Sequence, residues 1–129
     1  MPAPKHYPGS GDVKLIIGDA ELTLRPTLDA ALALSRESGG IRQAITKVAN
    51  MDIDAIVSII KLGVGREEAK RLKNLERMVY ENGLLDAQGE ICARCIEYLS
   101  NLARGGRSEA DVSGADGDES EDRPTTQAQ

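Results

Sequence analysis

The sequence contains no tryptophan, no phenylalanine and only three tyrosines among its 129 residues. A folded core must therefore be built from leucine, isoleucine, valine and alanine, each of which contributes less buried area than an aromatic ring. Apolar runs long enough to span a bilayer are also missing, so no membrane helix is expected. A chain of this length predicts one domain with tails, of moderate stability.

Histidine is almost absent as well, which limits the chemistry that the chain could perform. The only histidine is His6, in a lead-in over residues 1–11 that is rich in proline and glycine. Neither a regular element nor a secretory signal is expected there. A Ser-His-Asp set cannot be built on one such histidine, and neither glycine-rich phosphate motif occurs. We therefore expect no catalytic residue, no cofactor and no enzyme activity.

The two cysteines, Cys92 and Cys95, have the CxxC spacing of redox and zinc sites. A structural zinc ion needs four ligands, and a thioredoxin-like motif belongs at a helix start after a strand. This pair instead falls in the middle of a predicted helix, at positions that share its apolar side. The cysteines are expected to be two small buried hydrophobes, and no metal site is expected.

Negative charge is concentrated at the end of the chain. The formal net charge is −5, and residues 107–129 carry seven acidic and two basic side chains, which account for all of it. Residues 1–106 are neutral, a poor match to the basic surface that nucleic acid binding requires. The C-terminal residues include almost no apolar side chain, so we expect them to be disordered.

The order of structural elements follows from the periodicity of apolar residues. Alternation predicts a β-hairpin over about residues 12–25, which turns at Gly18-Asp19. Helical spacing predicts helices throughout the rest of the body. These helices begin after the N-cap Thr27, at Ile41, after the N-cap Asp52, at Arg66 and after the N-cap Asp86; they end near Gly39-Gly40, Ala49, Gly63 and Gly65, Glu81 and Ala103.

The predicted fold class is mainly α, with an N-terminal β-hairpin packed on four to five short helices. The predicted organisation is a disordered lead-in (1–11), one helical domain (12–104) and a disordered acidic tail (105–129). The predicted core comprises Leu15, Ile17, Leu24, Leu32, Ile45, Ile56, Ile60, Leu72, Leu75, Val79, Cys95 and Leu99.

Four basic residues recur along the predicted helix over residues 66–81. Arg66, Lys70, Lys73 and Arg77 stand at i, i+4, i+7 and i+11 and would form one basic stripe. Glutamates flank the stripe, so an ordinary solvated helix face is one interpretation. The other is a docking stripe for an acidic partner or for the chain's own acidic tail. These four are the candidate partner-binding residues.

The segment from Val13 to Leu34, VKLIIGDAELTLRPTLDAALAL, resembles the opening of the tail assembly chaperone family of tailed phages and gene transfer agents. Some members of that family are labelled tail tube proteins. They also begin with a hairpin that ends in a Leu-Arg-Pro-Thr-like step into a helix. The resemblance continues through Gly39-Gly40 to Tyr80-Glu81-Asn82-Gly83-Leu84, which looks like the family's Glu-x-Gly-Leu turn. It covers about residues 12–104, although the fourth predicted helix is more basic than is usual in the family.

The resemblance implies a function without catalysis. A tail assembly chaperone coats the long, aggregation-prone tape measure protein and promotes polymerisation of the tail tube around it, in the cytoplasm of a bacterial host. The implied partners are the tape measure protein and the tail tube protein, with a homo-oligomer left open and neither nucleic acid nor membrane expected.

Two other functions are compatible with the sequence. One is a structural subunit of the tail, and the other is a small helical regulatory protein that binds DNA or neutralises a toxin. The neighbouring genes discriminate the regulatory protein from the chaperone, because a chaperone gene is expected between those of the tail tube and the tape measure. Recovery from purified particles, at the stoichiometry of a tube ring, would favour the structural subunit.

Overall fold

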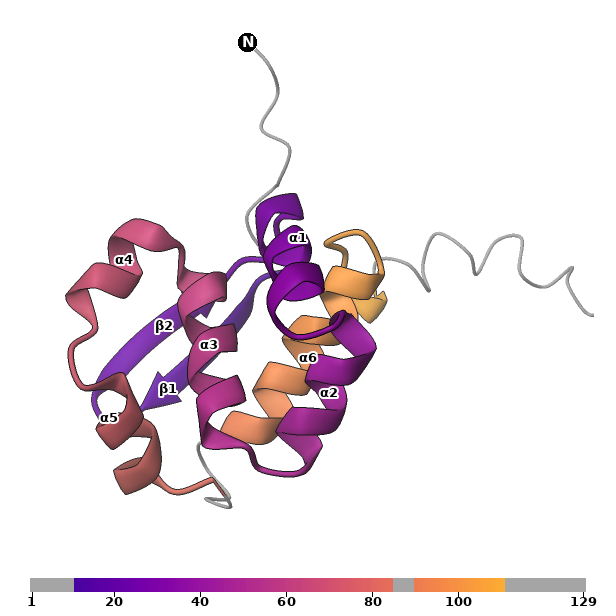
Figure 1. Cartoon of the computed structure of the whole chain (residues 1–129). Coiled ribbons are helices and arrows are strands. Elements are labelled where there is room, and N and C mark those ends of the chain that lie inside the picture. The colour runs from indigo at the N-terminus through magenta and orange to yellow at the C-terminus, as the bar shows by residue number, and fades with distance from the viewer. Residues whose placement is uncertain (1–10, 85–89, 111–129) are drawn as a thin grey trace, which may run out of the picture.

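The structure, a computed structural model, describes residues 11–84 and 90–110. In these ranges the chain forms a two-stranded antiparallel hairpin followed by six helices (Figure 1). The elements are β1 (Val13–Ile17), β2 (Ala20–Leu24), α1 (Leu28–Glu37), α2 (Ile41–Ala49), α3 (Ile53–Val64), α4 (Arg66–Arg71), α5 (Leu75–Asn82) and α6 (Ile91–Ala103). The expected fold class, mainly α with an N-terminal hairpin, is confirmed.

The hairpin has one buried and one exposed face, as its alternating sequence predicts. Val13 pairs with Leu24 and Leu15 with Leu22, across a turn formed by Gly18-Asp19. The buried face consists of Val13, Leu15, Ile17, Leu22 and Leu24. The opposite face is open and carries an ion pair of 3.5 Å between the Nζ of Lys14 and the Oε2 of Glu21. A two-stranded hairpin is marginal alone, so its stability depends on the helices behind it.

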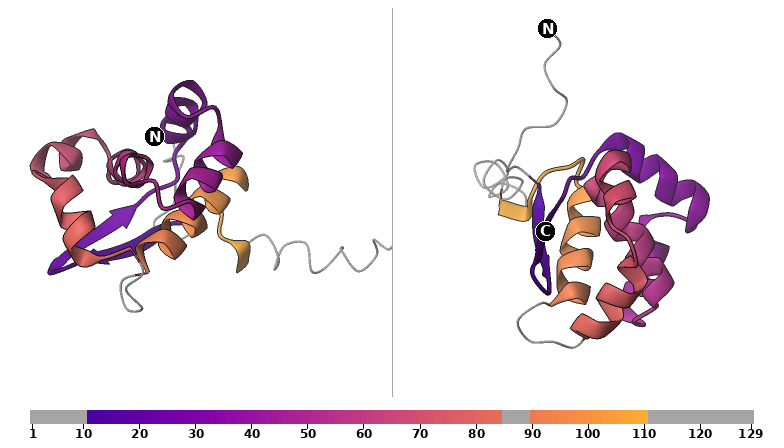
Figure 2. Two further views of the ribbon diagram at one scale, coloured as in Figure 1. Left: turned by 60° about the horizontal axis from the view of Figure 1, so that its bottom comes forward. Right: turned by 90° about the vertical axis from the view of Figure 1, so that its left-hand side faces the viewer.

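The helices pack in layers behind the buried face of the hairpin. Helix α6 contacts β1 and α3 contacts β2, while α2 packs on α6. Helix α1 contacts only the neighbouring helices α2 and α3 to any extent, and it lies at the margin of the body, away from the hairpin (Figure 2). The core therefore sits between the hairpin, α3 and α6, and α1 is peripheral to it.

Most of the predicted core is confirmed. Leu15, Ile17, Leu24, Ile56, Ile60, Leu75, Val79, Cys95 and Leu99 are buried. Ile45 and Leu72 are partly buried against this cluster. The prediction is wrong for Leu32, whose side chain is 40% exposed, because α1 turns a different face to the core.

Of the two glycines predicted to close the third helix, Gly65 does so as the C-cap after Val64, whereas Gly63 lies inside α3. A Cβ on Gly63 would stand 2.8 Å from the Cβ of Leu24, closer than real side-chain contacts come. The carbonyl of Gly63 also accepts a hydrogen bond of 2.8 Å from the backbone N–H of Arg25. This glycine therefore lets α3 approach the end of β2 at backbone distance.

The prediction of one helix over residues 66–81 is wrong, because the structure has two helices there. Helix α4 ends at Arg71, and α5 begins at Leu75 after Asn74, which adopts the left-handed conformation (φ 59°). Asparagine tolerates that conformation better than most residues. Helix α4 fully buries none of its residues and packs on the core only through the partly buried Ala69, so little holds it in line with α5. The break raises the number of helices to six.

The helix starts predicted from capping residues can be tested at two of three positions. The hydroxyl of Thr27 accepts a hydrogen bond from the N–H of Ala30, and Asp52 caps Ala55 in the same way, which confirms both caps. Asp86, the third predicted cap, lies outside the described residues. The same holds for residues 1–10, including His6, and for residues 111–129 of the acidic tail.

Candidate functional site

The two cysteines are free; the predicted burial is confirmed for Cys95, whereas Cys92 is only partly buried. Burial raises the pKa of the Cys95 thiol from 9.0 to about 12, with a smaller contribution from the neighbouring Cys92. Burial also raises the pKa of Cys92, which is only partly exposed. Redox exchange and metal binding both require a thiolate, which this environment disfavours. Among the described residues, no group of three or more His, Cys, Asp and Glu side chains could hold a metal ion.

The four candidate basic residues do not share one helix. Arg66 and Lys70 belong to α4, Lys73 lies in the connection, and Arg77 belongs to α5. The guanidinium of Arg77 lies 3.5 Å from the carboxylate of Glu81, and this pair is exposed. The single stripe deduced from helical spacing is therefore wrong, since the spacing held only for an unbroken helix. A role of these residues in binding a partner remains a prediction.

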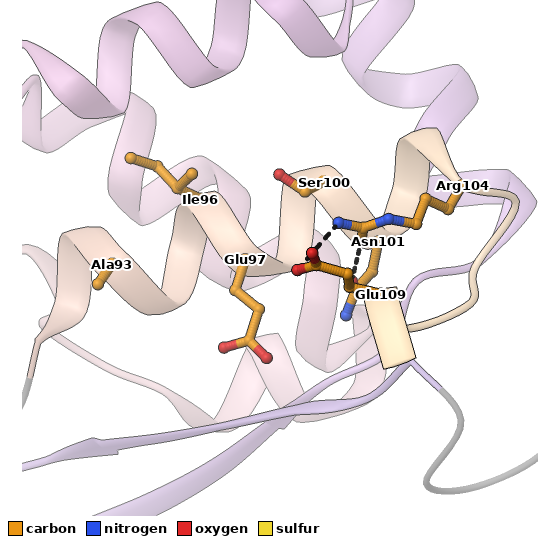
Figure 3. A pocket seen from close by; sticks show the side chains of 7 residues that line it. All are labelled: Ala93, Ile96, Glu97, Ser100, Asn101, Arg104 and Glu109. Atoms are coloured by element: carbon orange, nitrogen blue, oxygen red, sulfur yellow. Dashed lines mark hydrogen bonds and ion pairs between the residues drawn. The ribbon is translucent and has the colours of Figure 1, made fainter. Parts of the chain in front are cut away.

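The buried polar residue Asn101 was missed by sequence reasoning. Its side-chain amide donates a hydrogen bond of 2.9 Å to the carbonyl of Gly11, and its oxygen accepts one of 2.8 Å from the guanidinium of Arg104. Arg104 in turn lies 3.8 Å from the carboxylate of Glu109 (Figure 3). Asn101 thus joins the first described residues to the end of α6. An asparagine on the apolar arc of a predicted helix was the available signal.

A cleft of about 310 Å³ opens beside this junction, along α6. It is lined by Ala93, Ile96, Glu97, Ser100, Asn101, Arg104 and Glu109 (Figure 3). Glu97 pairs with Arg94 at 2.9 Å, and the other charged groups pair with one another. The charged groups and the amide that line the cleft therefore already have partners within the described part of the chain.

A second hollow of about 390 Å³ lies between the hairpin turn and α5. Here the side-chain oxygen of Asn82 accepts a hydrogen bond of 3.0 Å from the N–H of Gly18, and the amide group donates to the carbonyl of Gly83. Met78 supplies part of the apolar lining. The hydrogen bonds of Asn82 hold the hairpin turn against α5, so the residues at this hollow have a structural role.

The outward face of α1 is the clearest unused surface of the described chain. Leu28 is 72% exposed and Leu32 is 40% exposed, whereas Ala30 and Leu34 on the opposite face are buried. Leu28 and Leu32 stand one turn apart on one side of the helix. The remaining large exposed hydrophobics lie elsewhere in the described chain: Ile16, Met51 and Tyr80. We call the surface formed by Leu28, Leu32, Asp29 and Arg36 the α1 face.

Comparison of the chain with family models, with curated proteins and with solved structures finds no match. In the described part of the chain, no helix has both the length and the apolar character needed to cross a membrane.

Proposed function

We propose that the chain is a tail assembly chaperone of a phage or gene-transfer-agent particle. In this role it coats the tape measure protein in the cytoplasm of the bacterial host and promotes polymerisation of the tail tube. The proposal combines the resemblance of residues 12–104 with one structural observation, the α1 face. It includes the absence of enzymatic activity.

The α1 face supports the proposal because its chemistry suits a helical client. A tape measure protein is a long helical chain that exposes apolar stripes until the tube encloses it. Two leucines one turn apart offer such a stripe a small apolar contact of the helix-on-helix kind. The contact is small and therefore weak, which permits release when the tube forms. Many weak contacts along one client still give a stable coat through multivalency.

The test is co-expression with the tape measure protein encoded in the same gene cluster, with the soluble fraction of that client as readout. The full chain is expected to keep the client soluble and to co-purify with it. The double variant Leu28→Glu, Leu32→Glu is expected to lose both effects, because two charges replace the apolar contact. Tyr80→Glu is the matched control, since Tyr80 is 72% exposed like Leu28 but lies on α5.

The outcomes separate the function from the site. A client that stays insoluble with the full chain contradicts the chaperone function. If Tyr80→Glu loses client binding and the α1 double variant binds normally, the chaperone function stands, but the client binds near Tyr80 on α5 and not on the α1 face. Recovery of the chain from finished particles, at the stoichiometry of a tube ring, would favour a structural subunit over a chaperone.

A further inference from the structure

The α1 face carries opposite charges at its two ends. Asp29 lies in the first turn of the helix and Arg36 in the last, and both side chains are exposed. Neither forms an ion pair with another described residue. Seven residues are close to two full turns, so the two charges stand on one side of α1, about 10 Å apart along its axis. Leu28 and Leu32 lie beside them.

This arrangement is self-complementary. If two α1 helices pack antiparallel across a two-fold axis near Leu32, Asp29 of each helix stands opposite Arg36 of the other. The leucines then meet at the centre, and Ala31 and Ala33 next to them allow close approach of the helices. Parallel packing would instead place like charges together. A surface that matches itself in this way is what a two-fold symmetric contact requires.

We propose that, before a client is bound, the α1 face is covered by the α1 face of a second copy of the chain. The contact is one short helix on another, which buries much less than the roughly 800 Å² per partner of a standard interface. The dimer is therefore weak and concentration-dependent, and a client that offers many sites displaces it. The inference goes beyond the chaperone function and is tested without a client.

The experiment uses sedimentation velocity of the full chain from about 1 μM to about 1 mM, a range that resolves weak association. The wild-type chain is expected to shift from monomer to dimer within it. Asp29→Arg and Arg36→Asp, each alone, place like charges opposite each other and are expected to weaken association at least about tenfold, equivalent to about 1.4 kcal/mol. An equimolar mixture of the two variants is expected to restore it as a heterodimer, because both pairs are then complementary.

The controls address folding and the location of the contact. Circular dichroism shows whether each variant keeps its helix content, and the double variant Asp29→Arg, Arg36→Asp is expected to dimerise like the wild type. The double variant Lys14→Glu, Glu21→Lys reverses an exposed ion pair on the hairpin and is expected to leave the association unchanged.

Three results would overturn the inference. The first is a wild-type chain that stays monomeric at every concentration. The second is a mixture of the two single variants that associates no better than either alone. The third is association that appears only after residues 1–10 are deleted, which would make that segment the occupant of the α1 face. All three results are obtained without a client, so a failure of this inference is distinguishable from a failure of the chaperone function.

Discussion

Helices α1 and α6 both carry apolar residues at helical spacing but use them differently. Helix α6 lies between the hairpin and α2, and most of its apolar residues are buried: Ile91, Cys95, Tyr98, Leu99 and Leu102. Helix α1 buries only Ala30 and Leu34 and leaves two leucines in solvent. Burying one leucine contributes about 1.5–3 kcal/mol, and Leu28 forgoes most of that. The difference shows that periodicity identifies which residues share a face, whereas the neighbouring elements decide whether the face is covered.

The largest expected effect comes from making the same substitution in both helices. Leu99→Ala is expected to lower the free energy of unfolding by about 2–5 kcal/mol, because Leu99 is fully buried and the substitution leaves a cavity. Leu28→Ala is expected to change it by no more than about 0.5 kcal/mol, because most of that side chain is already in water. Urea denaturation, at a concentration where the chain is monomeric, measures both.

Similar losses for the two variants would mean that the α1 face is covered in the isolated chain. Repeating the Leu28→Ala measurement at high protein concentration sharpens the comparison. A loss that appears only at high concentration indicates that a second copy covers Leu28.

Much of the fold could be predicted from the sequence, because local patterns determine it. Alternation gave the hairpin, and the side chains of Thr27 and Asp52 gave two helix starts. The face of α1 could not be predicted, because Leu28 and Leu32 satisfy helical spacing as well as Ala30 and Leu34 do. Only the position of α2 and α3 decides between the two faces.

The break between α4 and α5 and the role of Asn101 were missed for related reasons. Asn74 stands within a continuous helical pattern, and the sparse packing of α4, which fully buries no residue, lets the left-handed conformation of Asn74 prevail. Asn101 bonds to Gly11, which is 90 residues away in sequence, so no local pattern reports that contact. The four candidate basic residues were predicted to form one stripe on one helix, and the stripe was wrong because the helix breaks between α4 and α5.

A smaller effect is expected from Cys95 on α6, and it depends on pH. The pKa of this thiol is 9.0 ordinarily and about 12 in the folded chain, so the folded state holds the proton more tightly than the unfolded state. The resulting stability is complete below pH 9 and is lost as pH rises toward 12, by up to about 1.4 kcal/mol per pH unit. Burial also raises the pKa of Tyr98 above its ordinary 10.0, so this hydroxyl adds to the loss once the pH exceeds about 10.

The substitution Cys95→Ala separates the thiol from the other groups. At pH 7 the variant is expected to be less stable by about 1–3 kcal/mol, because packing is lost. Between pH 9 and 11 the two stability curves are expected to converge, because only the wild-type chain loses stability through this thiol. Urea denaturation at several pH values measures the difference. Parallel curves would show that Cys95 titrates normally and is not sealed in the core.

The smallest expected effect concerns the acidic residues that follow α6. Residues 111–129 carry a net charge of −5, and nineteen residues can extend to roughly 60 Å, far enough to reach α4 and α5. Arg66, Lys70 and Lys73 are exposed there, with no partner among the described residues. We expect transient contact between the two, even though the basic residues do not form one stripe. Each exposed pair contributes only about 0.2–1 kcal/mol, and salt screens it.

Amide chemical shifts of the full chain and of a chain ending at residue 110 measure this contact. Shift differences on α4 and the connection to α5 are expected at about 20 mM salt and are expected to fade at about 500 mM, where the screening length falls to a few ångströms. Amides of α1 provide the internal control, because the α1 face has one charge of each sign and attracts the tail weakly. The truncated chain is expected to unfold at the same urea concentration, since the contact is too weak to change stability. Identical chemical shifts in both chains at low salt would show that the acidic residues do not contact α4 or α5. Their role would then be to keep the chain in solution, because repulsion between like-charged copies needs no contact with the body.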